Sequence, residues 1–294
     1  MTKSVNLRIY PDRARKVAKR LIEALEGEGI FGRKDLPDDL IIDVIDGKNI
    51  EKSLLVVTLT TALDYMRNAE ELWKSSVKTL SDEEVSWVFN PGSVMERGES
   101  ELKEALLKHK LAKKKEKDTR IWRKISETLH RKYGGKVSNL FKEYGYDVRA
   151  MFEDFTKNRK EEFPSLSGTK LFPHWIRSLK DKFNLPFKRL EELPIPVDVH
   201  VARATLTTGC VRGKYSSKGI SEALRKRVIE VWKEALKDTS IAPIEMFRPL
   251  WLLSKHGCHY RKNGERPKIK ECPVADFCVE GKVVVSSARV EIDT

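Results

Sequence analysis

Lys170, in the middle of the chain, has a type and surroundings that suit covalent chemistry. It ends the turn-forming sequence FPSLSGTK, and Thr169 before it is predicted to cap a helix that opens at about Lys170. The positive end of a helix dipole disfavours an ammonium in the first turn, which favours the neutral amine. A neutral amine is a nucleophile, so Lys170 is a candidate for attack on an electrophilic carbon.

Asp198 is the second candidate, and it stands in the segment LPIPVDVHVAR. Pro194 and Pro196 favour an extended lead-in, which places the aspartate at the entry to a helix. The residues alone leave simpler interpretations open. Asp198 has the type and position of an ordinary helix N-cap, and Lys170 taken by itself is an exposed, solvated lysine.

Together the two segments resemble the helix-hairpin-helix superfamily of DNA glycosylases. Its signature is a hairpin of the form L-P-G-[VI]-G-x-K, followed by V-D-x-H-[VI]-x-R at a helix start. In the family the lysine attacks the sugar anomeric carbon and forms a Schiff base, while the aspartate assists departure of the base; the resemblance implies these roles for Lys170 and Asp198. The residues that carry it are Pro164, Gly168, Thr169 and Lys170, then Pro196, Val197, Asp198, Val199, His200, Val201 and Arg203.

The resemblance also implies DNA contacts at Gly168, Thr169, His200 and Arg203. The hairpin departs from the family pattern, because PSLSGTK is one residue longer and has serines where glycines are expected. The LPIPVD lead-in is similar to archaeal 8-oxoguanine DNA glycosylases.

All four cysteines follow Asp198 in the chain, and they are Cys210, Cys258, Cys272 and Cys278. Cysteines grouped toward one end of a Cys-poor chain favour metal ligation over disulfides. The last two stand in ECPVADFC, which resembles the final cluster loop of endonuclease III-like glycosylases and implies a 4Fe-4S cluster held by four thiolates. A zinc site made by the same thiolates, or buried free cysteines, are the alternatives.

The loop between Cys258 and Cys272 is basic, and in the family such a loop grips DNA phosphates. This implies DNA contacts at Arg261, Lys262 and Lys268. The whole chain has 57 Lys and Arg against 44 Asp and Glu, a net charge of +13 that favours a polyanionic partner. A further basic run lies between Lys113 and Lys124, and it is either a solvated face or a phosphate-binding face.

Helical periodicity dominates the chain, so the predicted fold is mainly α. We expect two helical subdomains with a DNA-binding cleft between them, plus a C-terminal cysteine-cluster loop and a short β tail. The central subdomain is predicted over residues 50–170, ending in the hairpin. The second is predicted from residues 1–49 plus 171–294, with the four-cysteine segment over 210–278. Long helices are expected from Pro11 to Leu25 and over residues 50–78.

The chain is therefore predicted to be a base-excision repair glycosylase with AP-lyase activity. Its expected partner is double-stranded DNA with an oxidised or deaminated base. No apolar run approaches a membrane-spanning length and the N-terminus has no apolar targeting region, so a cytoplasmic monomer without a membrane partner is expected. Three alternatives stay open: a monofunctional glycosylase using Asp198, a non-catalytic helical DNA-binding protein, and an RNA-binding protein with a zinc site.

Overall fold

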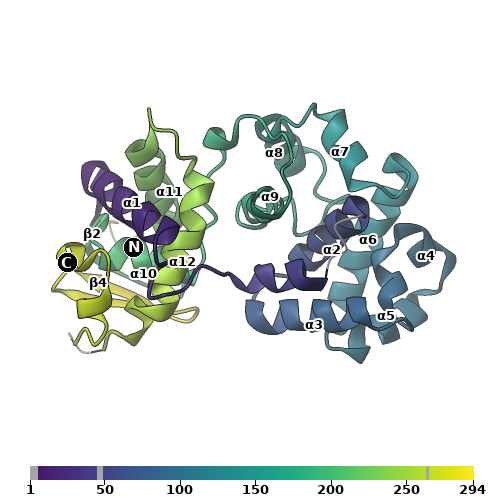
Figure 1. Ribbon diagram of the computed structural model, residues 1–294, viewed down its shortest axis with the longest axis horizontal. Helices are drawn as coiled ribbons and strands as arrows, with labels where there is room; N and C mark the ends of the chain where they lie inside the picture. The colour runs from purple at the N-terminus through teal and green to yellow at the C-terminus, as the bar shows by residue number, and fades with distance from the viewer. Residues whose placement is uncertain (1–5, 45–48, 263–264) are drawn as a thin grey trace, which may run out of the picture. The chain divides into compact units, whose positions relative to one another are not determined.

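The structure is a computed structural model that describes residues 6–44, 49–262 and 265–294. The chain divides into two compact units (Figure 1). Unit 1 comprises Met1–Asp35 together with Pro194–Thr294, and unit 2 comprises Leu36–Leu193. Within the described ranges, no helix has the length and apolar character that crossing a bilayer requires.

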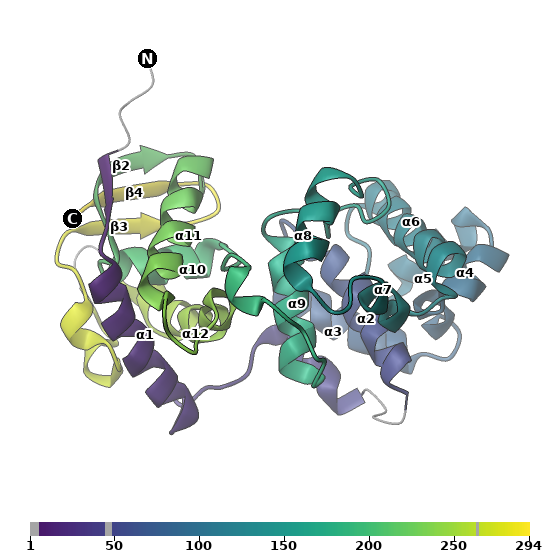
Figure 2. The ribbon, with the colours of Figure 1, turned by 90° about the horizontal axis from the view of Figure 1, so that it is seen from above.

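The described part of unit 1 combines a small sheet with α-helices and short 3-10 helices, and helices α10 and α11 pack against the sheet (Figure 2). The sheet is antiparallel throughout, with strand order β1-β2-β4-β3. The Trp232 indole donates a hydrogen bond of 2.9 Å to Thr205 Oγ1 and so ties α11 to α10. The elements are β1 (Asn6–Ile9), α1 (Pro11–Glu26), α10 (Val199–Thr207), β2 (Val211–Ser217), α11 (Glu222–Leu236), η4 (Pro243–Met246), α12 (Phe247–His256), η5 (Cys258–Tyr260), η6 (Ile269–Glu271), η7 (Ala275–Phe277), β3 (Lys282–Val285) and β4 (Val290–Asp293).

The predicted β tail is real, but it is part of a larger sheet. Strands β3 and β4 form the expected hairpin, and β2 and β1 extend it. Gly213 in β2 permits the β1 pairing, because a Cβ there would lie 1.8 Å from Asn6 O. The sequence did not indicate β1 or β2, since both are short and their pairing joins distant parts of the chain.

Unit 2 is helical, and its described part contains no strand. Helix α2 lies at its centre, in contact with α3, α6, α7 and α9. The elements are η1 (Pro37–Val44), α2 (Ile50–Ala62), α3 (Ala69–Ser81), η2 (Ser86–Phe89), α4 (Pro91–Glu96), α5 (Glu99–Lys108), α6 (Lys115–Tyr133), α7 (Val137–Glu143), α8 (Val148–Lys157), α9 (Leu171–Lys182) and η3 (Leu190–Glu192).

The single helix predicted over residues 50–78 is two helices. Helix α2 ends at Ala62, and α3 begins at Ala69. The Asn68 side chain caps α3 by accepting hydrogen bonds from Glu70 N and Glu71 N. The helical period continues across this break, so hydrophobic spacing alone did not reveal it, whereas an asparagine three residues before a glutamate is a cap signal that could have.

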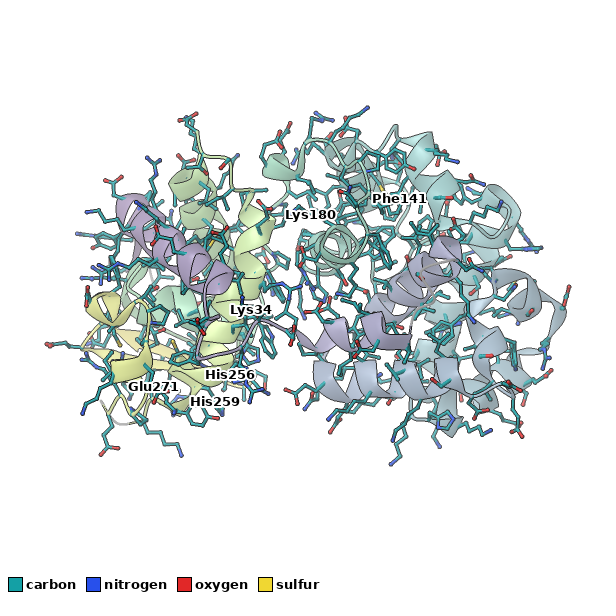
Figure 3. All side chains as sticks on the ribbon, in the orientation of Figure 1. Lys34, Phe141, Lys180, His256, His259 and Glu271 are labelled. Atoms are coloured by element: carbon teal, nitrogen blue, oxygen red, sulfur yellow. The ribbon has the colours of Figure 1, made fainter. Side chains whose placement is uncertain are left out.

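The unit boundaries also differ from those predicted. Helix α9 was assigned to the second subdomain, but it belongs to unit 2, where it packs on α2. The Trp175 indole on α9 donates a hydrogen bond of 2.9 Å to Thr58 on α2, and both side chains are buried. Trp175 also contacts Phe141 and Phe172, and Figure 3 shows Phe141 among the helices of this unit.

Buried charges hold α9 to η1. The Asp38 carboxylate accepts hydrogen bonds from Arg177 Nη2 at 2.9 Å, Ser178 Oγ at 2.6 Å and Lys182 Nζ at 2.6 Å. The side chains of the two cations are each 1% exposed. Burial alone would raise the pKa of Asp38, but Arg177 and Lys182 hold it well below its usual range.

We expect Asp38→Asn to lower the free energy of unfolding by about 3–5 kcal/mol, because it leaves two buried cations without their shared carboxylate. Urea unfolding measures the change. The wild-type contribution is present above the unfolded carboxyl pKa, near pH 4, and is lost as pH falls toward the lowered folded value. Glu101→Gln breaks an exposed pair with Arg97 and should change stability by less than about 1 kcal/mol. Equal effects of the two variants would contradict this account.

Candidate functional site

Lys170 stands at the N-terminus of α9, where the sequence placed it. It is the N-cap residue of this helix and is partly exposed. Thr169 was predicted to cap the helix, but no side chain caps it. The first backbone bond of the turn instead runs from Phe172 N to Gly168 O at 3.0 Å. Lys170 therefore projects from a rigid helix start whose following residues are buried in unit 2.

The segment before Lys170 is a compact turn. Ser167 N donates to Phe163 O, and Gly168 N donates to Ser165 O at 3.2 Å. The left-handed residue of the turn is Ser165, with φ of 70°, and not a glycine. Gly168 and Thr169 are exposed, so the two residues predicted to contact DNA are accessible on the surface of unit 2.

The basic run of α6 lies beside this turn. Lys117, Arg120 and Lys124 line a hollow of about 550 Å³ together with Glu161 and Pro164. Pro164 belongs to the turn that leads to Lys170, so cationic side chains adjoin the segment that carries the candidate nucleophile. Glu127 also lines the hollow and pairs with Lys124 at 3.4 Å, so both interpretations of this run stay open.

Asp198 lies in unit 1 and caps α10. Its Oδ1 accepts hydrogen bonds from His200 N and Val201 N, both at 2.8 Å. The simple N-cap interpretation is therefore confirmed. Capping uses one carboxylate oxygen for these bonds, and the side chain remains partly exposed. Asp198 and Lys170 lie in different units, so the cleft predicted between subdomains stays a prediction.

His200 and Arg203 are held inside unit 1. Burial lowers the pKa of His200 to about 4, and its ring lies 4.8 Å from that of Trp251. Arg203 Nη1 donates to Ser254 Oγ at 3.0 Å, and its Nη2 donates to Val285 O at 2.6 Å. These contacts join α10 to α12 and β3, which is a structural role that the sequence did not indicate.

The three basic residues of the cysteine loop differ in their surroundings. Arg261 donates to Val279 O at 2.7 Å and to Glu280 O at 2.9 Å, so its guanidinium fixes the chain before β3. Lys268 pairs with Glu271 at 3.2 Å on the surface. Lys262 is exposed, and it is the best placed of the three to meet a phosphate.

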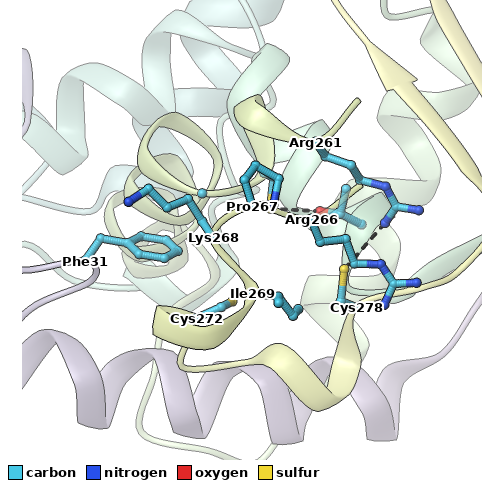
Figure 4. Close-up of a pocket in the computed structure, with 11 residues that line it drawn as sticks. Phe31, Arg261, Arg266, Pro267, Lys268, Ile269, Cys272 and Cys278 are labelled. Atoms are coloured by element: carbon cyan, nitrogen blue, oxygen red, sulfur yellow. Dashed lines mark hydrogen bonds between the residues drawn. The ribbon is translucent and has the colours of Figure 1, made fainter. Parts of the chain in front are cut away.

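Three of the four cysteines line one small cavity of about 40 Å³ (Figure 4). They are Cys258, Cys272 and Cys278. Thr207 Oγ1 donates to Cys258 Sγ at 3.1 Å, and Arg261 Nη1 lies 3.4 Å from Cys278 Sγ. Burial raises the pKa of the Cys258 thiol to about 12 and that of Cys272 to about 11.

Cys210 is buried, is not among the residues that line this cavity, and interacts with Thr208 at 3.2 Å. A 4Fe-4S cluster or a structural zinc ion needs four ligands. Among the described residues, no group of three or more His, Cys, Asp or Glu has an arrangement that could hold a metal ion. The arrangement of the cysteines thus does not fit a four-thiolate group, and the iron–sulfur cluster, with zinc as its alternative, stays a prediction.

The comparison with known families matches the part of the chain that carries the candidate site residues. The model of the AGOG family, described as N-glycosylase/DNA lyase, matches residues 168–286. This match confirms the prediction of an enzyme. It also supports the helix-hairpin-helix glycosylase superfamily and a DNA glycosylase/lyase activity in base excision repair. The matched range contains Lys170, Asp198 and all four cysteines. No curated protein matches the chain.

Substitutions of Arg203 and Lys262 should give opposite results. We expect Arg203→Ala to lower the free energy of unfolding by about 2 kcal/mol or more, because it removes the partly buried hydrogen bonds to Ser254 Oγ and Val285 O. Lys262→Ala should leave stability unchanged and reduce by about one the slope of log affinity for duplex DNA against log salt. Urea unfolding and salt-dependent binding measure the two effects. An Arg203 variant of unchanged stability would show that its contacts are dispensable.

Metal analysis of the purified protein tests the cofactor prediction. The cluster prediction expects iron and acid-labile sulfide in equal amounts, and zinc without iron would favour the alternative. Because a four-thiolate group uses all four cysteines, the cofactor prediction expects Cys272→Ser and Cys210→Ser each to lower the amount of bound metal. Absence of both metals would contradict the cofactor prediction.

Proposed function

We propose that this protein is a bifunctional DNA glycosylase that removes a damaged base and then cleaves the strand through a lysine Schiff base. The observation that carries the proposal is the family match over residues 168–286, which contains a lysine and an aspartate that each stand at a helix start. Both residue types suit the two halves of the reaction. A lysine amine supplies the nucleophile and a carboxylate supplies a fixed negative charge.

In the proposed reaction, the neutral Lys170 amine attacks the anomeric carbon of the damaged nucleotide. The bond from nitrogen to carbon forms as the glycosidic bond breaks, and the bonding electrons leave with the base, which takes up a proton. The sugar ring then opens to a Schiff base between Lys170 and the anomeric carbon. Loss of a proton from the adjacent carbon expels the 3′ phosphate by elimination, and hydrolysis returns the free amine.

Asp198 has a defined part in this proposal. Positive charge develops on the sugar as the base departs, and a carboxylate near it lowers the energy of that state. The two backbone bonds to Oδ1 fix the orientation of the side chain. A residue that is both a cap and an electrostatic stabiliser is therefore held rigid before substrate binds. The proposal requires both units to meet the same nucleotide.

The proposed substrate is duplex DNA with an oxidised purine, 8-oxoguanine first among them. Support for DNA comes from the net charge of +13 and from the cationic hollow on α6 beside the turn that leads to Lys170. Support for the oxidised purine is the similarity of LPIPVD to archaeal 8-oxoguanine glycosylases. The damaged nucleotide must leave the base stack to reach the lysine.

Borohydride trapping on a panel of duplexes tests the proposal, with one lesion or an abasic site in each duplex. We expect a covalent adduct on the 8-oxoguanine duplex with wild-type protein and none with Lys170→Ala. Lys180→Ala changes another lysine of α9 and is the matched control. Base release without an adduct would favour the monofunctional alternative, and neither base release nor an adduct would leave DNA binding as the function.

Two variants distinguish the capping role of Asp198 from its proposed role in catalysis. Asn caps helices as well as Asp does, so Asp198→Asn should leave the free energy of unfolding unchanged. It should lower the rate of base release by about a hundredfold or more. Asp198→Ala should lower the rate of base release and should also lower the free energy of unfolding by about 1 kcal/mol. Single-turnover base release and urea unfolding measure these effects. Full activity in Asp198→Asn would restrict the residue to its capping role.

A further inference from the structure

Three of the four cysteines lie in the segment 258–278, of which the structure describes residues 258–262 and 265–278. A four-thiolate group would join this segment to Cys210 and fix its course through ligand bonds. Cys258, Cys272 and Cys278 line one cavity, and Cys210 is not among its lining residues. Because this arrangement does not fit such a group, the segment depends on contacts from other side chains of unit 1.

Arg13 on α1 joins the chain beside Cys210 to the chain beside Cys278. Its Nε donates to Thr208 O at 2.7 Å, and its Nη2 donates to Phe277 O at 2.8 Å. Its guanidinium carbon also lies 5.0 Å from the centre of the Phe277 ring. Thr208 precedes Cys210 by two residues, and Phe277 directly precedes Cys278. One partly buried guanidinium therefore makes a connection that a metal bound to both cysteines would make.

Arg261 joins the two ends of the segment. It follows Cys258 by three residues, and its guanidinium donates to Val279 O at 2.7 Å and to Glu280 O at 2.9 Å. Figure 4 shows this guanidinium beside the Cys278 sulfur, which lies 3.4 Å from Nη1. A planar guanidinium presents several donors in a fixed fork, and hydrogen bonds from a charged donor are stronger than neutral ones. Arg261 therefore links the chain beside Cys258 to the chain beside Cys278.

Backbone hydrogen bonds fix the last part of the segment. Ala275 N donates to Cys272 O at 3.2 Å, and Cys278 N donates to Ala275 O at 2.9 Å, so two turns carry the chain from Cys272 to Cys278. Val279 N then donates to Thr207 O at 2.9 Å, which holds the end of the segment against α10. The chain beside each of the other three cysteines is thus joined to the chain beside Cys278 by protein hydrogen bonds.

We infer that Arg13 and Arg261 clamp the 258–278 segment, and that the segment keeps its conformation without a bound metal. The inference is an alternative to the cofactor prediction, and in it the four cysteines are free thiols. It has a consequence that rests on the proposed function, because the segment carries Lys262, which is exposed and expected to meet a DNA phosphate. Duplex binding by this segment then depends on two arginines and not on a supply of iron or zinc.

Thermal unfolding and hydrogen exchange test the inference on the full chain, purified from cells supplied with iron and zinc. Treatment with a chelator that removes both metals should leave the unfolding midpoint unchanged. Arg13→Lys and Arg261→Lys keep the charge but lose the fork of donors, so each should lower the midpoint by about 5 °C or more. Each should also speed hydrogen exchange in the peptide that contains Val279, because the end of the segment is then less well held.

Two variants are the controls. Arg227→Lys changes an arginine of α11 that pairs with Glu230 at 2.7 Å on the surface, and it should leave the midpoint and the exchange as in wild type. Cys272→Ser removes one thiol from the cavity, and it should not speed exchange in the peptide that contains Val279. Faster exchange in Cys272→Ser, to the extent seen in the two arginine variants, would overturn the inference.

Iron or zinc bound in stoichiometric amount to the wild-type protein overturns the inference, and so does a midpoint that falls on chelation. These two results decide it even where an arginine variant does not fold. Folded Arg13→Lys and Arg261→Lys variants with the wild-type midpoint also overturn it, because the clamp is then dispensable. None of these measurements uses DNA, so an absence of adduct at Lys170 overturns the proposed function and leaves the clamp inference intact.

Discussion

The Asp38 carboxylate and the three donors around it fix the part of the structure on which the proposed chemistry depends. Charges taken out of water are stable only when they are paired and hydrogen-bonded. Arg177, Ser178 and Lys182 all lie on α9 and all meet Asp38, so the helix is held to η1 along its C-terminal half. In the N-terminal half of α9, Trp175 anchors the helix to α2. Lys170 thus stands at the start of a helix that cannot shift without breaking a buried contact.

The two proposed catalytic residues share one structural setting in two separate units. Each stands at the N-terminus of a helix, where backbone N–H groups lack partners within the helix. In α10, Asp198 satisfies two of them and is oriented by doing so. In α9 no side chain has this role, and the positive end of the dipole faces the lysine. A carboxylate is therefore held rigid by the start of one helix, while a lysine stands at the start of another helix whose dipole does not favour an ammonium.

The sequence predicted the features that depend on local pattern. Helical spacing predicted α1 almost to the residue, and the proline-bracketed aspartate predicted the start of α10. It did not predict β1 and β2, whose pairing joins segments more than 190 residues apart in the chain. The contact between Asp64 and His174, 3.3 Å from Oδ2 to Nε2, was missed for a similar reason. It joins the segment after α2 to helix α9, which only the folded core brings together, and neither residue has a neighbouring motif.

The central claim is that the Lys170 amine forms the covalent bond to DNA, and mass spectrometry of the reduced adduct tests it most directly. After trapping with borohydride, digestion with nuclease and trypsin leaves a sugar remnant on the reacting lysine, which trypsin then no longer cleaves. The account predicts this modification on Lys170, in a peptide that reads through this residue. A remnant on any other lysine would contradict the account, because Lys170 would then be close to the reaction without taking part in it.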